Sequence, residues 1–252
     1  MAESNKEKDC KKELQLREQG KIYLLFNKIA DRYDITNRFL SFGQDSKWRN
    51  ELIRHIQIPE NTQTFYILDL ATGTGEILKA YRRQYPDNGF IIGIDLAENM
   101  LRGAQEKFCQ EKNKLWLFSI MDATQLGIST NSVDVVTIAF GIRNVSEIQT
   151  ALQEIYRVLK PGGQLLILEF GLPQKGLWRK IYLFYLRHIL PCLGGLWTNC
   201  SPAYQYLSQT ICDFPSHNHF LQILNKEGFI QTQWIEFNRG AVLLYLAQKA
   251  KS

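Results

Sequence analysis

A glycine-rich turn in the first third of the chain has the residue types and spacing that point most directly to chemistry. Residues 67–76 read ILDLATGTGE, in which apolar β-forming residues lead into Asp69 and a helical pattern follows the glycines. Gly73 and Gly75 have no Cβ and tolerate positive φ, so a ligand can approach the backbone closely. A nucleotide-like ligand is the first expectation, and we predict that Asp69, Gly73, Thr74 and Gly75 contact it.

The same turn departs from the fingerprint of a dinucleotide-binding loop. That fingerprint needs a third glycine for close packing of the helix against the strand, and Leu78 stands at its position. Asp69 before the loop and Glu76 after it place carboxylates where a pyrophosphate would require an electropositive helix end. These carboxylates favour a ligand that has no phosphates and carries a positive charge.

S-Adenosylmethionine is a ligand of that kind, because its sulfonium and its amino-acid tail carry positive charge. Asp95 ends the run IIGIDL, where its carboxylate can accept hydrogen bonds from both ribose hydroxyls. Asp122, followed by Ala123, ends the next such run and can receive the adenine amine. Each aspartate taken singly also fits a turn or a helix cap, but at the carboxyl ends of consecutive strands they together predict a cofactor site.

The placement of these residues depends on strand-like and helix-like apolar patterns that alternate along the chain. The clearest helical pattern covers 148–159, with Ser146 as its expected N-cap and Pro161-Gly162-Gly163 as its stop. This alternation predicts an α/β fold with a mostly parallel sheet, helices on both faces and an antiparallel C-terminal hairpin. The strand-like runs are 64–70, 90–96, 115–121, 133–140, 164–170, 229–237 and 241–247.

Length and composition predict a single domain over residues 1–252. No linker rich in Pro, Gly or Ser interrupts the chain, and an apolar fraction of 45% supplies a sizeable core. We expect 1–20 to be a flexible tail and 171–215 to be an insertion or lid on the substrate side. The net charge of +5 is compatible with an anionic membrane surface or nucleic acid, and equally with the needs of solubility alone.

Cysteine and histidine give no sign of a disulfide framework or a metal site. The five cysteines are odd in number and include no C-x-x-C pair, which is typical of a reducing compartment. His217 and His219 have no acidic or cysteine partner at ligand spacing, so we expect two exposed histidines that open a helix after Pro215. No metal ligand is predicted.

Targeting signals are also not apparent in the sequence. The N-terminus carries both signs of charge, unlike a signal peptide or an acid-poor transit peptide. The apolar stretch 177–197 contains four basic residues and is broken by Pro191 and two glycines, so it cannot form a clean membrane-spanning helix. We therefore expect a cytoplasmic protein that can work at the inner face of the membrane.

From about residue 26 onward the chain resembles the class I methyltransferases, and more narrowly the UbiE/MenG-type family that C-methylates quinol rings in ubiquinone and menaquinone biosynthesis. The glycine loop and K-P-G-G are general to methyltransferases, whereas F-G-I-R-N-V and A-Y-Q-Y-L are much more specific. The elements that carry the resemblance are FNKIADRYDITNRFLSFGQDSKWR (26–49), DLATGTG (69–75), DLAENML (95–101), TIAFGIRNV (137–145), YRVLKPGGQLLILEF (156–170), SPAYQYLSQTICDFP (201–215) and RGAVLLYLAQK (239–249).

The resemblance implies a Rossmann-like fold with a seven-stranded sheet and a set of cofactor contacts. Those contacts are Thr74, Asp95, Asp122 and Ala123. Ala139 stands where relatives often have serine, which removes one hydroxyl from the site, and Thr72 stands where many have glycine. Asp122 replaces an asparagine of some members and can still accept a hydrogen bond from an amine.

The reaction implied is an in-line displacement at the sulfonium methyl by a ring carbon that a quinol hydroxyl makes electron-rich. The enzyme must hold carbon and methyl in near-attack geometry and stabilise phenolate character. Arg143 is our candidate for that stabilisation and Asn144 for orienting the ring oxygen or the arginine; the alternative is that Arg143 is a solvated charge at a helix start. Tyr33, Arg143 and Tyr204 are expected on the substrate, and the proton acceptor is left open between a bound water and Asp34.

The expected partner is a polyprenylated quinol, most directly demethylmenaquinol, although a benzoquinol would use the same machinery. Residues 176–197 mix aromatics, leucines and cations, as an interfacial helix or a lid over an apolar groove does; ordinary core helices are the alternative. A homodimer and peripheral membrane contact through 176–197 are further partners to test. Nucleic acid is not expected.

Two other classes of protein share some of these sequence features. A nucleic-acid methyltransferase would share the fold, but no basic stripe with interleaved aromatics marks a nucleic-acid track, and Pro191-Cys192 follows the fifth predicted strand where a cytosine C5 enzyme needs it after the fourth. A ligand-binding protein without activity would be favoured by a blocked cofactor loop, and DLATGTGE is intact.

Overall fold

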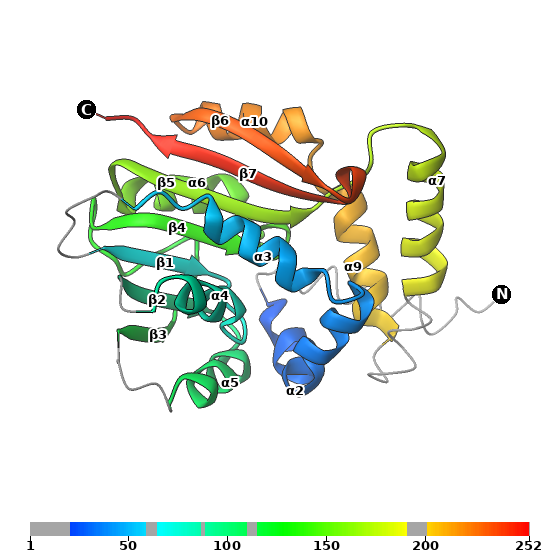
Figure 1. Cartoon of the computed structure of the whole chain (residues 1–252), viewed down its shortest axis with the longest axis horizontal. Coiled ribbons are helices and arrows are strands. Elements are labelled where there is room, and N and C mark those ends of the chain that lie inside the picture. The colour runs from blue at the N-terminus through cyan, green and yellow to red at the C-terminus, as the bar shows by residue number, and fades with distance from the viewer. Residues whose placement is uncertain (1–20, 59–64, 87–88, 110–114, 191–200, 252) are drawn as a thin grey trace.

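A single mixed sheet forms the centre of the computed structural model, which describes residues 21–58, 65–86, 89–109, 115–190 and 201–251 but not the side chains of 31, 32, 39, 40 and 201–205. Within these residues the strand order is β3-β2-β1-β4-β5-β7-β6 (Figure 1). The first five strands run parallel, and β7 is antiparallel to both β5 and β6. The strands are β1 Tyr66–Leu70, β2 Phe90–Asp95, β3 Trp116–Ile120, β4 Val133–Ala139, β5 Leu159–Phe170, β6 Phe229–Phe237 and β7 Val242–Lys249.

Helices cover both faces of this sheet. One face packs against α3 (Asp45–Arg54), α4 (Glu76–Gln84) and α5 (Glu98–Phe108), and the other against α6 (Ile148–Val158) and α10 (His217–Lys226). Burial on both faces explains the nearly continuous apolar runs of β1 and β4, since alternation is needed only where one face meets water. The sheet and its two helical layers confirm the predicted fold class.

A third group of helices stands at the carboxyl ends of the parallel strands. It consists of α2 (Tyr23–Leu40), α7 (Gly176–Phe184), the π-helical turn η2 (Tyr185–Ile189) and α9 (Ser201–Asp213) (Figure 1). Their apolar side chains form a separate small core, whose buried members are Ile22, Leu25, Leu186, Leu190, Tyr206 and Ile211. These helices therefore wall the end of the sheet where ligands of open α/β folds bind.

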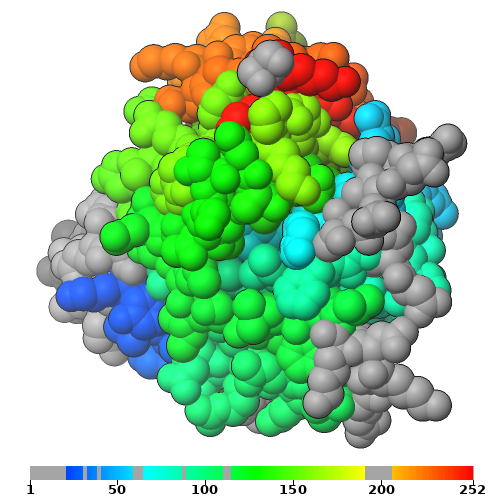
Figure 2. Space-filling model, turned by 90° about the vertical axis from the view of Figure 1, so that its left-hand side faces the viewer, coloured from blue at the N-terminus to red at the C-terminus, as the bar shows by residue number. Residues whose placement is uncertain are grey.

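The chain reverses direction across the sheet between β1 and β4. After β1 it continues outward through β2 and β3, and it then returns to β4 on the other side of β1, so the loops that follow β1 and β4 separate at this point. Figure 2 shows the left-hand side of Figure 1, which is the end where the parallel strands begin. The orange and red residues of α10, β6 and β7 lie above the green central residues in this view. The site described below lies at the end away from that view.

Two local predictions differ from the structure. Glu147, rather than Ser146, precedes α6, and no side chain caps that helix. The strand β5 begins at Leu159, not Gln164, because Leu159 already pairs with Val133 before a register shift brings Val135 opposite Gln164. A bulge of this kind adds residues to one strand without ending the sheet. Residues 161–163, which were predicted to end the helix, therefore belong to an irregular part of β5.

Candidate active site

Side chains from three strand ends meet in one pocket at the switch point. Asp69 lies within β1, Asp95 ends β2, and Asp122 follows β3. All three line the same pocket together with Gly73, Thr74 and Ala123. The structure thus brings together every residue predicted to contact the cofactor except Gly75.

Gly75 serves the loop rather than the pocket. It adopts φ 80° and precedes α4, and a Cβ added there would lie 3.2 Å from Cε2 of Phe108. Glycine is therefore needed for backbone conformation and for packing against α5. Gly75 is not among the residues that line the pocket, and its contact with the cofactor stays a prediction.

Asp95 holds the glycine loop and the start of α5 at once. Its Oδ2 accepts a hydrogen bond from the backbone N–H of Gly73 at 2.8 Å, and its Oδ1 accepts one from Ala97 at 2.8 Å. Burial raises the pKa of Asp95, and these backbone hydrogen bonds oppose that rise. The carboxylate therefore sits on the floor of the pocket with its orientation fixed by two backbone groups.

Asp69 is a buried acid with one oxygen committed and one left over. Thr137 donates a hydrogen bond from its hydroxyl to Asp69 Oδ1 at 2.6 Å. Asp69 Oδ2 and the buried Thr72 hydroxyl make no hydrogen bond of ordinary geometry among the described residues, although Thr72 lies near enough to lower the pKa of Asp69, and both residues line the pocket. Burial raises the pKa of Asp69 to about 7, against the hydrogen bonds that lower it. Two buried polar atoms of this kind fit a ligand that brings hydrogen-bond donors.

Asp122 is more exposed and also shapes its own turn. Its Oδ1 accepts hydrogen bonds from the Thr124 backbone N–H at 2.8 Å and from the Thr124 hydroxyl at 2.7 Å. The turn role that we weighed against a ligand role is thus real for Oδ1. Asp122 and Ala123 nevertheless line the pocket on the side of β3.

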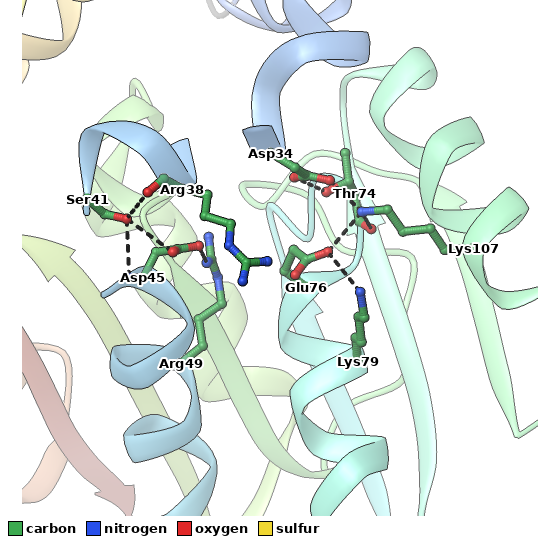
Figure 3. A network of polar contacts seen from close by, with 9 residues as sticks. All are labelled: Asp34, Arg38, Ser41, Asp45, Arg49, Thr74, Glu76, Lys79 and Lys107. Atoms are coloured by element: carbon green, nitrogen blue, oxygen red, sulfur yellow. Dashed lines mark hydrogen bonds and ion pairs between the residues drawn. The ribbon is translucent and has the colours of Figure 1, made fainter. Parts of the chain in front are cut away.

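The helix α2 is tied across the glycine loop by a polar network (Figure 3). Thr74 donates its hydroxyl to Asp34 Oδ1 at 2.6 Å, and Lys107 Nζ bonds Asp34 Oδ2 at 2.5 Å and Glu76 Oε1 at 2.9 Å. Tyr33, one residue before Asp34, lines the same pocket. The pocket therefore has a floor of strand ends and a wall from α2.

A second, mostly apolar pocket adjoins the first. Its empty volume, including the mouth, is about 1710 Å³, against about 1100 Å³ for the polar pocket. The two share a wall made of Phe26, Tyr33, Arg49 and Phe140. Further lining comes from α2, α3, α7, η2 and α9, which supply the aromatic and aliphatic residues Ile29, Trp48, Tyr182, Tyr185, Leu186 and Ile211.

Comparison with known proteins assigns the chain to a family. The family model described as the ubiE/COQ5 methyltransferase family matches residues 14–249. The chain belongs to this family. A relative from Syntrophotalea carbinolica, the ubiquinone/menaquinone biosynthesis C-methyltransferase UbiE, is 40% identical over 88% of this chain and 91% of its own. The chain is accordingly an S-adenosylmethionine-dependent C-methyltransferase, and the comparisons do not favour the nucleic-acid alternative.

Solved structures of methyltransferases share the fold of this UbiE/COQ5 family member at low identity. A protein from Methanococcus maripaludis assigned to the S-adenosylmethionine-dependent methyltransferases superposes with a TM-score of 0.64, 17% identity, and coverage of 90% of this chain and 94% of that one. A phosphoethanolamine N-methyltransferase from Haemonchus contortus, in complex with S-adenosylhomocysteine, gives a TM-score of 0.58 at 20% identity, with coverage of 80% and 52%. These neighbours place the chain in the Rossmann-like class I fold.

Arg143 lines the apolar pocket of the methyltransferase, and its side chain is shielded from solvent. Only 4% of the residue is exposed, and Nη1 donates to Glu169 Oε1 at 2.7 Å and to the Phe140 carbonyl at 2.5 Å. Its guanidinium carbon lies 5.4 Å from the ring centroid of Phe170. The alternative of a solvated charge at a helix start is therefore wrong. Glu169 is fully buried, so the arginine compensates a charge that has no access to water.

Asn144 lies one residue further on and lines the polar pocket. Its Oδ1 accepts a hydrogen bond from the Tyr206 hydroxyl at 3.0 Å, which ties the turn after β4 to α9. Tyr204, also predicted on the substrate, belongs to α9, but its side chain lies outside the described residues, as do residues 191–197 of the apolar stretch 176–197.

The histidine prediction was partly wrong. His217 does open α10, but it is buried and packs on Trp234 with the ring centroids 5.3 Å apart. His219 is exposed as expected. Among the described side chains, no cluster of three His, Cys, Asp or Glu has metal-ligand geometry.

Sequence reasoning missed Arg49 of the shared wall and Asp45, which lines the apolar pocket beside it. Both lie in the first turns of α3, and each is less than 10% exposed. Charged residues four apart on a helix usually form a surface pair, so their spacing alone gives no sign of burial. The available signal was their place in the S-F-G…W-R element, which is part of the resemblance to the family.

Proposed function

We propose that this methyltransferase transfers the methyl group of S-adenosylmethionine to a ring carbon of a polyprenylated quinol, converting demethylmenaquinol to menaquinol. The observation that carries the proposal is the wall shared by the two pockets. A cofactor held over the strand ends and a ring held among aromatic side chains would meet at Phe26, Tyr33, Arg49 and Phe140. C-methylation in menaquinone or ubiquinone biosynthesis, the function named for the relatives, needs such a meeting point.

The polar pocket has suitable groups for each part of the cofactor. Asp69 Oδ2 and the Thr72 hydroxyl are buried acceptors for the ammonium of the amino-acid tail. Asp95 would receive the ribose hydroxyls, and Asp122 with Ala123 would lie beside the adenine. When bound, the cofactor supplies an electrophilic methyl group, and the protein's part is to orient that group and to exclude water from it.

Arg143 and Asn144 remain our proposed catalytic pair. Arg143 borders the apolar pocket, Asn144 borders the polar one, and they are adjacent in the turn η1 (Ile142–Asn144) that follows β4. Because Arg143 is matched by Glu169, its proposed role is to fix the turn and to polarise the substrate rather than to supply an uncompensated charge. Tyr33 lies in both pockets and would contact the ring, and Tyr204 keeps its proposed substrate role.

We assign residues 171–215 the role of a lid in the single domain. The described part of this segment supplies α7, η2 and α9, which line the apolar pocket, and the prenyl tail would lie among their side chains. Leu177, Ile181 and Phe184 repeat on one face of α7, with exposed fractions of 73%, 48% and 58%. In the part of the chain that the structure describes, no helix is both long and apolar enough to cross a membrane. This face therefore suits shallow contact with the cytoplasmic surface of a membrane, where a long-tailed quinol would be reached.

The activity is tested with purified protein, methyl-labelled S-adenosylmethionine and three acceptors: 2-prenyl-1,4-naphthoquinol, a prenylated benzoquinol and RNA. We expect label in the naphthoquinol, with less in the benzoquinol and none in RNA. Binding of S-adenosylhomocysteine without transfer to either quinol would overturn the proposal. Label in RNA alone would establish the rival function.

Membrane contact is tested by sedimentation with anionic phospholipid vesicles. Replacing Leu177, Ile181 and Phe184 by serine should release the protein from the vesicles. The matched control replaces Leu117 and Ile120, two exposed apolar residues of β3, and should leave binding unchanged. Equal partitioning of both variants would contradict the proposal. If the wild-type protein sediments as a dimer without vesicles and the α7 variant sediments as a monomer, the face would instead be assigned to a homodimer.

A further inference from the structure

Asp45 and Arg49 form a buried ion pair next to the wall that the two pockets share. Arg49 Nη1 donates to Asp45 Oδ2 at 2.5 Å, and the residues are 8% and 9% exposed (Figure 3). Asp45 Oδ1 accepts a hydrogen bond from the Ser41 hydroxyl at 3.1 Å. Burial of an ion pair costs desolvation that a surface pair avoids, so the pair is not explained by stability alone.

The position of this pair is set by the pockets that it lines. Arg49 lines both pockets, whereas Asp45 and Ser41 line the apolar one. The Arg49 guanidinium carbon lies 5.5 Å from the ring centroid of Phe140, which is also part of the shared wall. Arg49 Nε is buried and has no hydrogen-bond partner among the described residues. Arg49 and Asp45 thus bring a guanidinium and a carboxylate to the lining of a mostly apolar pocket.

The other titratable groups near the pair come from α2, from β1 and from the turn η1, which supplies Arg143 to the same pocket. Burial raises the pKa of Tyr33, and the charges of Arg143 and Arg49 oppose that rise. Asp69 in the polar pocket also feels the Arg49 charge. Asp34, which we considered as proton acceptor, lines only the polar pocket and is held by Thr74 and Lys107. Among the described carboxylates, Asp45 alone lines the apolar pocket.

We infer that the Asp45–Arg49 pair binds the ring hydroxyl of the quinol, with Asp45 taking its proton and Arg49 donating to the oxygen that becomes negative. The inference rests on the proposed function. It names the proton acceptor that the sequence left open, and it assigns the phenolate to a guanidinium at the junction of the two pockets.

The proton transfers and the methyl transfer together conserve atoms and electrons. The quinol O–H bond breaks toward the Asp45 carboxylate, the ring carbon bonds the methyl carbon, and the electron pair of the C–S bond stays on sulfur. The ring is then a methylated dienone. Its ring-carbon hydrogen leaves as a proton to water, and Asp45 returns its proton to the oxygen, which restores the aromatic quinol. One methyl group is transferred and one proton is released.

The experiment compares Asp45→Asn, Arg49→Lys and Arg49→Met with Arg54→Met as control. Arg54 pairs with Glu51 on the same helix, but it is exposed and lines neither pocket. For each variant kcat and KM are measured with 2-prenyl-1,4-naphthoquinol from pH 6 to 9.5, together with the Kd of S-adenosylhomocysteine and the melting temperature. The double variant Asp45→Asn, Arg49→Gln keeps a neutral hydrogen-bonded pair in case a single change prevents folding.

We expect kcat to fall about 100-fold in Asp45→Asn and Arg49→Met, with the Kd of S-adenosylhomocysteine within about threefold of wild type. Arg49→Lys should recover part of the loss. In Asp45→Asn, log kcat should rise with unit slope toward alkaline pH, because the quinol must then ionise without an acceptor. Arg54→Met should match wild type.

Near-normal kcat in Asp45→Asn and Arg49→Met, or in the double variant, would overturn the inference. So would a loss of turnover that only follows a loss of cofactor binding or of melting temperature, with an unchanged pH profile. A wild-type enzyme that methylates no quinol would refute the proposed function itself, and the two failures are therefore distinguishable.

Discussion

The hydroxyl of Thr74 donates a hydrogen bond of 2.6 Å to Asp34, a residue 40 positions earlier in the chain, and so joins the glycine loop to α2. Lys107 from α5 bonds the same carboxylate and the Thr74 carbonyl. One acidic side chain thereby holds three elements around the polar pocket. Its removal should loosen the wall that covers the cofactor.

Replacement of Asp34 by alanine is therefore expected to weaken S-adenosylhomocysteine binding about tenfold, since hydrogen bonds to charged groups contribute about 1.5–3 kcal/mol. Titration calorimetry measures this. Glu98→Ala, which removes an exposed ion pair with Arg102 on α5, is the control and should bind normally. An unchanged Kd in Asp34→Ala would show that α2 does not cover the bound cofactor.

Cofactor affinity should depend on pH through Asp69. Its pKa is raised by burial to about 7, and a cationic ammonium beside Oδ2 favours the ionised form. Below that pKa binding must displace a proton, so Kd should rise about tenfold per pH unit as the pH falls. The measurement is calorimetry with S-adenosylhomocysteine from pH 5.5 to 8.5. Asp69→Asn should bind weakly and show no such slope; a slope that persists in this variant assigns it to another group.

The same group gives the free protein a pH-dependent stability. A carboxyl whose pKa is higher in the folded state than in the unfolded one binds more protons when folded, so stability falls as pH rises between about 4 and 7. The cofactor-free enzyme should unfold at a lower temperature at pH 7.5 than at pH 5.5. The difference between these melting temperatures should shrink in Asp69→Asn relative to wild type.

Arg143 and Glu169 must be changed together to separate folding from catalysis. Arg143→Ala alone should destabilise the fold by about 3–5 kcal/mol, because it leaves the buried Glu169 without its partner. The double variant Arg143→Met, Glu169→Gln removes both charges and should regain much of that loss in denaturant unfolding. We expect this variant to bind S-adenosylhomocysteine but to lose most turnover. Near-normal kcat in it would remove Arg143 from the mechanism.

Gly141 and Ala71 approach too closely for a side chain at position 141. A Cβ there would lie 2.5 Å from the Cβ of Ala71, which itself has φ 51°. Gly141→Ala should cost about 1–3 kcal/mol and weaken cofactor binding, since both residues line the polar pocket. Ala71→Gly in the same chain should restore both, because it removes the contacting methyl group. If Ala71→Gly does not restore stability, the destabilisation by Gly141→Ala does not come from the contact with Ala71.

Much of the fold could be predicted because its signals are local. The strand-like runs, the helical pattern over 148–159 and the C-terminal hairpin follow from apolar period and turn residues within a few positions. The start of β5 was misplaced because its first residue pairs across a bulge with Val133, a contact that no local pattern contains. The missing N-cap at Ser146 is a similar case, since several polar residues can precede a helix.

The residues of the candidate site show the same difference between local signals and long-range contacts. Asp69, Asp95 and Asp122 could be assigned to one place because parallel strands bring their carboxyl ends to one edge of a sheet. Gly75 is predicted as a ligand residue from the loop alone, whereas its close approach to Phe108 of α5 depends on tertiary packing. His217 looked exposed, but Trp234 from β6 covers it.

The sequence by itself determined the strand ends, the acidic residues on them and the kind of cofactor they suit, because each depends on short-range order along the chain. Only the tertiary structure decided that Arg143 is matched by Glu169, 26 residues away, and that Asp45 and Arg49 are buried next to the wall that the two pockets share. Burial and charge pairing depend on which distant segments pack together. The Asp45–Arg49 pair would be solvated if α3 exposed it, but the packing of distant segments buries it beside the proposed reaction.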